Sequence, residues 1–298
     1  MKYVNKISIV TLTYKNWHLL NNAINSLASQ VIDKYYEVEY IIVDDGTVGF
    51  NVSYVEDLLC KLRALNFECH LIINEKNLGT VASFNNAIKK STGDLIVPLS
   101  ADDELYDENV IAKIIDKFNS NKCLLLTALR VPVRNEKELY VLPEKKYWNL
   151  FHFPKKLHEK ISLNGNIISG ACTYYHKNIF KKVGMFDEDY RLIEDYPFYL
   201  EVLSKGISIP LLKVKAIKYS MQGVSTNHRV SPLFTKDMNL LLQRILKEGE
   251  FNFFEKRYFH FQRCLPVTEK VRVKNIVLYP EQLALWVLRN VKKLIWRK

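Results

Sequence analysis

The first half of the chain alternates short apolar runs with segments of helical periodicity. The apolar runs are rich in Val, Ile and Leu, and they occupy Lys6–Leu12, Val38–Val43, His70–Ile73, Asp94–Leu99 and Leu124–Val133. The segments between them place apolar residues three or four positions apart, over Trp17–Gln30, Tyr54–Leu65, Val81–Lys90 and Glu108–Asn119. Strands that alternate with helices are typical of βαβ units. The pattern predicts an α/β fold with a mixed, mostly parallel sheet flanked by helices.

The second half of the chain is less regular. Charged and aromatic residues with two prolines fill Asn135–Asn166, which we interpret as a partly ordered surface excursion of the kind that often carries binding residues. After about Pro232 the pattern becomes helical and basic, over Phe234–Leu246 and Pro280–Lys298. We therefore expect an α/β domain over residues 1–225 and a basic, mainly helical C-terminal extension over residues 226–298.

Composition indicates an ordinary globular protein of the reducing cytosol. The 298 residues are 48% hydrophobic and 25% charged, which allows a large core. The five cysteines are scattered and show no Cys-x-x-Cys spacing, which argues against a disulfide framework and a zinc site. The net charge of +11 suits any polyanion, so charge alone does not identify a partner.

Membrane contact is expected to be peripheral and on the cytoplasmic side. Only a short apolar stretch, Ile7–Leu12, follows Lys2 and Lys6, so a signal peptide is not expected. No apolar run approaches the roughly 20 residues of a spanning helix. The segment Gln282–Lys298 carries five basic residues and no acidic one, and its apolar residues share a helical face. Such a helix either lies on the inner face of a membrane or packs on the domain.

Polar clusters follow the predicted strands, at the ends where doubly wound sheets bind ligands. These clusters are Thr13-Tyr14, Asp44-Asp45-Gly46, Asn74–Gly79 and Ser100–Asp103. Asp102 and Asp103 offer the oxygen ligands that Mg²⁺ combines with substrate phosphates, although a solvated turn and helix cap is the simpler interpretation of an acidic pair.

Two further acidic pairs are open to a functional and a structural interpretation. Gly46 lets the chain turn so that Asp44 or Asp45 can meet a ribose or a base, whereas Asp-Gly is also a hairpin signal. The helical pattern that follows favours the first interpretation. Glu194 and Asp195 precede an apolar helical stretch, where a carboxylate is most often a helix cap.

Taken in order, these motifs resemble the family 2 glycosyltransferases of the GT-A (Rossmann-like) fold, inverting enzymes that use nucleotide sugars. The resemblance spans about Ile7 to Ser225. The stretches that carry it are Ile7–Tyr14, Ile41–Thr47, Asn77–Gly79 with Asn85 and Asn86, Thr92–Asp94, Leu99–Asp103, Ser169–Gly170, Val183–Asp187 and Glu194–Asp195. The domain at residues 1–225 would then be the catalytic domain.

The resemblance implies a role for each site residue. Tyr14 would lie against the nucleobase, and Asp44 or Asp45 would hydrogen-bond base and ribose. The other nucleotide-binding residues would be Thr13, Asn77, Gly79, Asn85 and Asp102. Asp195 would be the general base, next to an acceptor site that includes Gly170 and Glu194.

The resemblance also implies a divalent cation, Mn²⁺ or Mg²⁺. Asp103 would be its ligand, and His228 would be a further ligand or diphosphate contact, although a lone His in a loop is more often an ordinary surface residue. The sequence departs from the usual family pattern at Leu12 and Lys15, where Pro and Asn are often found. Neither departure touches a carboxylate.

The predicted reaction is transfer of a sugar from a nucleotide-sugar donor to an acceptor hydroxyl. By family frequency the donor is UDP-linked, and the acceptor is a glycan or lipid-linked glycan in cell-surface polysaccharide biosynthesis. Three alternatives remain: a metal-dependent nucleotidyltransferase, a catalytically inactive relative, and a nucleic-acid-binding protein. Thr11–Asn16 lacks the Gly-rich phosphate loop expected of the first, and the acidic strand ends disfavour the last.

Overall fold

The computed structural model describes residues 3–135, 137–221, 231–282 and 284–285. The chain divides into two compact units. The first comprises Met1–His158 and Ile167–Asp237, and the second comprises Glu159–Asn166 and Met238–Lys298. The expected domain boundary at residues 225 and 226 lies outside the described residues.

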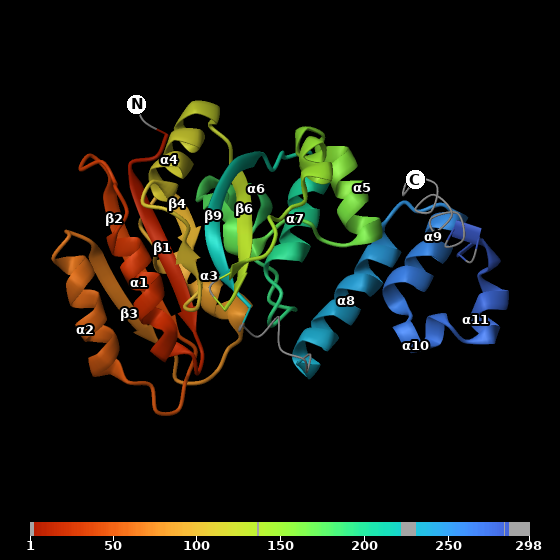
Figure 1. The fold of residues 1–298 in the computed structure, drawn as a ribbon, viewed down its shortest axis with the longest axis horizontal. Helices are drawn as coiled ribbons and strands as arrows, with labels where there is room; N and C mark the ends of the chain where they lie inside the picture. Colours follow the sequence, from red (N-terminus) through yellow and green to blue (C-terminus); the bar gives the residue numbers. More distant parts are fainter. Residues whose placement is uncertain (1–2, 136, 222–230, 283, 286–298) are drawn as a thin grey trace. The chain divides into compact units, whose positions relative to one another are not determined.

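The first unit contains one sheet with the spatial order β3-β2-β1-β4-β8-β6-β9-β5, and β7 pairs with β6 (Figure 1). The strands are β1 Lys6–Thr13, β2 Glu37–Asp44, β3 Glu68–Ile73, β4 Leu95–Pro98, β5 Glu104–Leu105, β6 Leu125–Arg134, β7 Lys137–Glu138, β8 Thr173–His176 and β9 Leu211–Ser220. Strands β1 to β4 are parallel, β8 runs antiparallel to both β4 and β6, and β9 is parallel to β6. The predicted mixed, mostly parallel sheet is confirmed.

Helices pack against the sheet, as in other doubly wound α/β folds. The helices of this unit are α1 Leu20–Ala28, α2 Val52–Arg63, α3 Thr80–Lys90, α4 Val110–Asn121, α6 Asn178–Val183 and α7 Asp195–Ser204, with 3₁₀ turns η1 Trp17–Leu19, η2 Lys145–His152 and η3 Gly170–Cys172. Buried residues of α1, α2 and α4 form one cluster with alternate strand residues such as Ile7, Ile9 and Ile42. The chain returns from β3 to β4 through α3, which packs on β1 and β2.

An aromatic cluster joins α3, β8, α6 and α7. Its members are Phe84, Tyr175, Phe180, Phe186 and Phe198, with ring centroids 4.8 to 6.5 Å apart. Edge-to-face pairs of this kind add to the stability gained from burial. The cluster fixes α7, whose first residue is Asp195.

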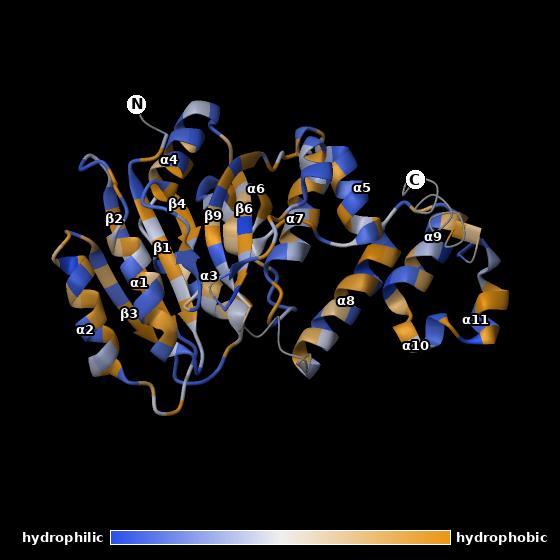
Figure 2. Ribbon diagram, viewed as in Figure 1, coloured by the Kyte–Doolittle hydropathy of each residue, from blue (hydrophilic) through white to orange (hydrophobic). Residues whose placement is uncertain are grey.

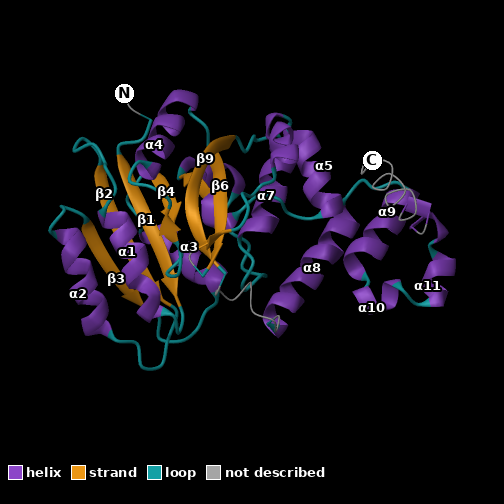
Figure 3. Cartoon of the chain, in the orientation of Figure 1, coloured by secondary structure: helices purple, strands orange, loops and turns teal. Residues whose placement is uncertain are grey.

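The second unit is helical (Figure 3). It contains α9 Phe253–Phe259, a π-helical turn η4 His260–Cys264, α10 Val267–Lys270 and α11 Val273–Leu278. Helices α5 Pro154–Asn164 and α8 Pro232–Glu248 run from the first unit into the second. Asn252 and Glu255 form a reciprocal capping box at the start of α9. The described helices thus include the first of the two predicted C-terminal helices, whereas most of Pro280–Lys298 lies outside the described residues.

The segment Asn135–Asn166 includes regular secondary structure. The predicted partly ordered excursion contains β7, η2 and α5. The sequence signal is weak because α5 is rich in charge, and Pro154 is compatible with the first position of a helix. None of the helices in the described residues is long and apolar enough to cross a bilayer.

Candidate active site

The predicted polar clusters meet at the edge of the sheet formed by the carboxyl ends of the parallel strands. Thr13 and Asp44 are register partners at the ends of β1 and β2, and Asp102 and Asp103 follow β4. Because β8 runs in the opposite direction, its start places Gly170 at the same edge. We call this side the carboxyl edge and the opposite side the amino edge.

Asp44 and Asp45 are both buried at the end of β2 but have different partners. Asp45 accepts four hydrogen bonds, from Asn74 Nδ2, the backbone N–H groups of Leu78 and Gly79, and Ser83 Oγ, at 2.8 to 3.0 Å. Asp44 accepts one through Oδ2, from the N–H of Thr47 at 2.7 Å. Asp45 therefore organises the loop at residues 74–79, and Asp44 is the better candidate for direct ligand contact.

Two glycines bring the loops of the carboxyl edge together. Gly46 has φ +72°, and a Cβ there would lie 2.4 Å from the backbone of Lys76. Gly79 has φ +91°, and a Cβ there would lie 2.4 Å from the side chain of Arg191. Only glycine fits such contacts at positive φ. The loops after β2 and β3 and the loop before α7 are therefore closely packed.

Arg191 links the loop at residues 74–79 to the segment that carries Glu194 and Asp195. Its Nη2 donates to the carbonyl and the side-chain oxygen of Asn77, at 2.9 and 3.0 Å. The buried Asp237 accepts from the backbone N–H groups of Arg191 and Leu192. Asn77, predicted as a nucleotide contact, thus also positions the loop before α7.

Asp103 is a buried carboxylate with an unpartnered oxygen. Its side chain is 1% exposed, and Oδ1 accepts from the N–H of Ser220 in β9 at 2.9 Å. Among the described residues Oδ2 has no hydrogen-bond partner. Burial raises the pKa of Asp103 to about 8, with a further rise from the charge of Asp102, and burial also raises the pKa of Asp102.

Glu194 and Asp195 form a second acidic pair, half-buried at the start of α7. Asp195 Oδ1 accepts from the N–H of Tyr196 at 2.7 Å. A Cβ on Gly170 would lie 2.9 Å from Asp195 Oδ2, so the glycine leaves room for this carboxylate. Burial raises the pKa of both carboxyl groups, and for Glu194 the charge of Asp195 adds to the rise. Carboxyl groups tuned toward neutral pH are suited to proton transfer.

Arg130 in β6 lies within electrostatic reach of both acidic pairs. Its positive charge opposes the pKa increases that burial causes in Asp103 and Asp195. The guanidinium carbon lies 4.5 Å from the ring centroid of Tyr219, and in the described part of the chain its buried Nε has no partner. Arg130 is not among the residues predicted for the site, although a charge that interrupts an apolar strand is a usable signal.

Unpartnered buried polar atoms are concentrated at this edge. Buried donors and acceptors are normally satisfied, so each exception requires an explanation. In the described ranges the exceptions are Asp44 Oδ1, Asp103 Oδ2, Arg130 Nε, Ser169 Oγ and Tyr174 Oη. Ser169 directly precedes Gly170, so four of these five atoms belong to the residues of the carboxyl edge. The arrangement fits a polar or charged ligand.

Comparison with known proteins agrees with this geometry. The family model described as glycosyl transferase family 2 matches residues 8–184, which is more than half of the chain. The chain belongs to glycosyltransferase family 2. The match includes the strand ends with Asp44, Asp45, Asp102 and Asp103, together with Gly170.

Similar proteins are also glycosyltransferases. An uncharacterised glycosyltransferase of Haemophilus influenzae is 23% identical over 248 residues, which are 82% of this chain and 72% of that protein. A second, from Rickettsia conorii, is 25% identical over 217 residues, and the match covers 70% of this chain and 33% of that longer protein. This family 2 chain is therefore a glycosyltransferase.

Solved structures share the fold. Staphylococcus aureus TarS in complex with UDP-GlcNAc superposes with a TM-score of 0.63 at 18% identity, covering 90% of this chain and 77% of that one. GalNAc-T7 with UDP, GalNAc and Mn²⁺ gives a TM-score of 0.61 at 15% identity, covering 90% and 53%. These similarities establish the GT-A fold.

Tyr14 and Lys15 are exposed where β1 ends at the carboxyl edge. The Tyr14 ring is 43% exposed and lies next to the end of β1, where a flat ligand has access. Lys15 has φ +65°, a left-handed conformation that Asn tolerates better than Lys. This requirement gives a physical reason for the Asn that family members often have here.

Two predicted residues are placed differently or lie beyond the description. Asn85 lies within α3, 1% exposed, and its amide bonds the backbone of Phe186 and the carboxylate of Glu188. Both ends of the Asn85 amide are thus engaged within the protein. His228, the predicted second metal contact, lies outside the described residues.

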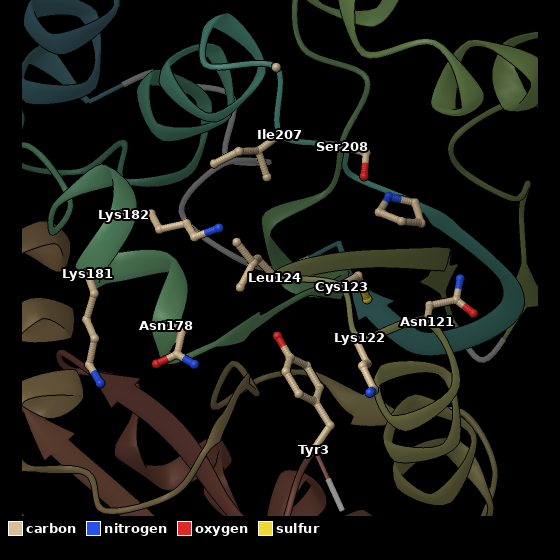
Figure 4. Close-up of a pocket in the computed structure, with 12 residues that line it drawn as sticks. Tyr3, Asn121, Lys122, Cys123, Leu124, Asn178, Lys181, Lys182, Ile207 and Ser208 are labelled. Carbon is tan, nitrogen blue, oxygen red and sulfur yellow. The ribbon is translucent and has the colours of Figure 1, made fainter.

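Two hollows lie at the amino edge, away from the acidic pairs of the carboxyl edge. One of about 750 Å³ is bordered by Tyr3, Lys122, Lys181 and Lys182 (Figure 4), and one of about 440 Å³ includes Glu39, Glu68 and His70. The last three residues offer ligand atoms within 4.8 Å of one another. The ammonium of Lys6 lies 2.6 Å from Glu68 and 3.9 Å from Glu39, so this acidic group already has a cation.

Proposed function

We propose that the protein is an inverting glycosyltransferase that transfers a sugar from a UDP-linked donor to a hydroxyl of a glycan or lipid-linked glycan. The observation that carries the proposal is the set of unpartnered buried polar atoms at the carboxyl edge, on Asp44, Asp103, Arg130 and Ser169. A nucleotide diphosphate with a cation supplies both the acceptors and the positive charge that these atoms lack.

The nucleotide end of the donor would lie over β1 and β2. Tyr14 offers an exposed ring for the base, and Asp44 keeps an oxygen for a base or ribose donor. Thr13, Asp45, Asn77 and Gly79 shape this end, because Asp45 holds the 74–79 loop through its hydrogen bonds. In TarS and GalNAc-T7 the bound nucleotides are UDP-GlcNAc and UDP, which supports UDP as the nucleotide.

The residues present fit a divalent cation at Asp103. Its buried Oδ2 is an unpartnered carboxylate oxygen, the donor type that Mg²⁺ and Mn²⁺ prefer, and Asp102 is adjacent. A cation bound there would neutralise charge on the departing diphosphate. Asp102 would then contact the nucleotide, and His228 would be a further ligand. The Mn²⁺ of GalNAc-T7 supports this part of the proposal.

Asp195 would act as the general base. Burial raises its pKa, which makes the carboxylate a better proton acceptor near neutral pH. It would accept the proton of the acceptor hydroxyl while the hydroxyl oxygen attacks the anomeric carbon and the bond to the diphosphate breaks on the opposite face. Gly170 and Glu194 would border the acceptor, and the guanidinium of Arg130 would balance the negative charge between the two acidic pairs.

The cellular setting follows from the acceptor class. We propose a role in cell-surface polysaccharide biosynthesis at the cytoplasmic face of the membrane. The catalytic residues belong to the domain that precedes the basic C-terminal extension. The basic segment Gln282–Lys298, most of which lies outside the described residues, would provide a peripheral membrane contact.

Calorimetric titration with UDP, GDP and dTDP, each with Mn²⁺ or with chelator, tests the donor site. We expect UDP to bind most tightly, to require the cation, and to lose roughly ten- to a hundredfold in affinity in Asp103→Asn. Asp116→Asn, a change of an exposed aspartate on α4, is the matched control and should leave binding unchanged. Absence of nucleotide binding under every condition would indicate an inactive relative.

A further inference from the structure

Helices α10 and α11 of the second unit expose an unusual number of valines. Val267, Val271, Val273 and Val277 are 77%, 71%, 76% and 72% exposed. They fall within eleven consecutive residues, and Leu278, which is 55% exposed, follows directly. Single exposed apolar residues need no explanation, but a concentration of them indicates an interaction surface. We call these four residues the valine surface.

The valines are exposed because polar contacts order the backbone between them. Asn275 is 4% exposed, and its side-chain nitrogen donates to the carbonyl of Glu269 at 2.8 Å. The ammonium of Lys270 donates to the carbonyl of Gln262 at 2.7 Å. These bonds hold the α10–α11 turn with its polar groups inward, which leaves the valines outside.

Cations are interleaved with the valines. Arg272 and Lys274 are exposed and alternate with Val271 and Val273 along the chain. The acidic residue of this stretch, Glu269, is paired with Arg272 at 2.8 Å. Figure 2 shows hydrophobic and hydrophilic colours alternating over α10 and α11. Apolar side chains flanked by cations match the boundary between the acyl chains and the anionic headgroups of a bilayer.

Charge is distributed unequally between the two units. Residues 238–281 contain eight Lys and Arg against five Asp and Glu, a net charge of +3, and residues 282–298 add five basic residues and no acidic one. This excess would draw the second unit toward any anionic surface within about a Debye length.

From this exposure and charge we propose that the valine surface inserts into an anionic lipid bilayer, with Arg272 and Lys274 contacting the headgroups. The inference rests on the proposed function in one respect, which is that the membrane would present the acceptor to the enzyme. It adds a membrane contact within the described residues that does not depend on the segment Gln282–Lys298.

Vesicle flotation of the intact chain tests the proposal. The variant combines Val271→Ser, Val273→Ser and Val277→Ser, which removes apolar surface without changing charge. The matched control combines Val31→Ser, Val52→Ser and Leu65→Ser, which are exposed apolar residues of the first unit. Each protein is mixed with vesicles of phosphatidylcholine alone or with phosphatidylglycerol.

We expect the wild type and the control to bind vesicles that contain phosphatidylglycerol. The bound fraction of the valine variant should be lower by about tenfold or more. Binding should weaken in about 0.5 M NaCl, where charge is screened. Equal binding of the wild type and the valine variant would overturn the proposal. It would also be overturned if the valine variant binds like the wild type and binding is lost only when the basic residues at 289–298 are replaced. A wild-type dimer that the valine variant dissociates, without vesicle binding, would overturn it in favour of a second copy.

Nucleotide binding separates this proposal from the proposed function. Calorimetry with UDP and Mn²⁺ in the absence of vesicles should give the same affinity for the wild type and the valine variant. A variant that binds UDP but not vesicles supports both proposals. Failure of the wild type to bind UDP overturns the donor site and leaves the vesicle result as an independent measurement.

Discussion

Two equally buried carboxyl groups, one at each edge of the sheet, have pKa shifts of opposite direction. Glu39 at the amino edge and Asp103 at the carboxyl edge are each 1% exposed. Burial alone raises the pKa of Glu39, but hydrogen bonds from Ser8, Thr92 and Gly93 lower it below its ordinary value. Burial, with the charge of Asp102, raises the pKa of Asp103 to about 8, and Oδ2 has no partner in the described structure.

The contrast distinguishes a structural carboxylate from a functional one. Burial of charge is unfavourable unless hydrogen bonds or an opposite charge compensate it. Glu39 has that compensation from its own chain, including Lys6 at 3.9 Å. Asp103 is compensated only in part, through Oδ1 and the charge of Arg130, and its Oδ2 is left for a ligand. The same reasoning separates Asp45, which has four hydrogen bonds, from Asp44 next to it.

The largest effect is expected from Asp195→Asn. Loss of the general base should lower sugar transfer by about 10²- to 10⁴-fold. UDP affinity should be unchanged, since the substitution leaves Asp44 and Asp103 intact. Initial rates and calorimetry on the same preparation measure both quantities. Retention of full transfer activity would exclude Asp195 as the base.

The next largest effect is expected on the free energy of unfolding, for which substitutions at the two edges should give different results. Glu39→Gln should lower the free energy of unfolding by about 2–3 kcal/mol, because its charged hydrogen bonds hold the 92–93 turn. Asp103→Asn should be close to neutral in the absence of a cation, because the Asp103 carboxyl already holds its proton at neutral pH and the substitution replaces one uncharged group by another. Urea denaturation of both variants measures the difference. Equal destabilisation would contradict the distinction between the edges.

The pH dependence of stability should have opposite signs at the two edges. Folded Asp103 keeps its proton up to a pKa of about 8, whereas the unfolded chain releases it near the ordinary value of 3.8. Its contribution therefore declines by about 1.4 kcal/mol per pH unit as the pH rises through this window. The contribution of Glu39 is present at neutral pH and declines as the pH falls through its lowered folded pKa.

Denaturation with chelator from acid to mildly alkaline pH checks this prediction. Asp103→Asn should flatten the decline toward alkaline pH, and Glu39→Gln should flatten the decline toward acid. An Asp103→Asn profile that matches the wild type would show that the Asp103 carboxyl does not titrate in the expected range.

The smallest effect is expected from Gly170→Ala. The added Cβ would lie 2.9 Å from Asp195 Oδ2, which forces the carboxylate to shift. A displaced base should lower kcat by about tenfold with little change in the KM for the donor. A change confined to the donor KM would place Gly170 outside the acceptor side.

The sequence predicted the parallel half of the sheet better than its mixed half. Residues 40–43 of β2, for example, are buried on both faces and form a continuous apolar run. Strand β9 was missed because Lys213, Lys215 and Lys218 interrupt it. The short strand β8 was missed because its four residues contain no helical or strand period long enough to recognise.

At the site, the sequence located the carboxylates but not their partners. Asp44 and Asp45 look alike in the sequence, and only the folded 74–79 loop distinguishes them. Arg130 and Asn85 depend on contacts between distant segments, to β9 for Arg130 and to Phe186 for Asn85. Long-range hydrogen bonds of this kind leave no periodic signal along the chain.

Anomalous diffraction from crystals soaked with Mn²⁺ and UDP tests the central claim most directly, because it locates the cation. We predict a peak beside Asp103 Oδ2 at the carboxyl edge and none at the group formed by Glu39, Glu68 and His70. A peak at that amino-edge group, or no peak at Asp103 with UDP bound, would contradict the assignment of the carboxyl edge as the donor site.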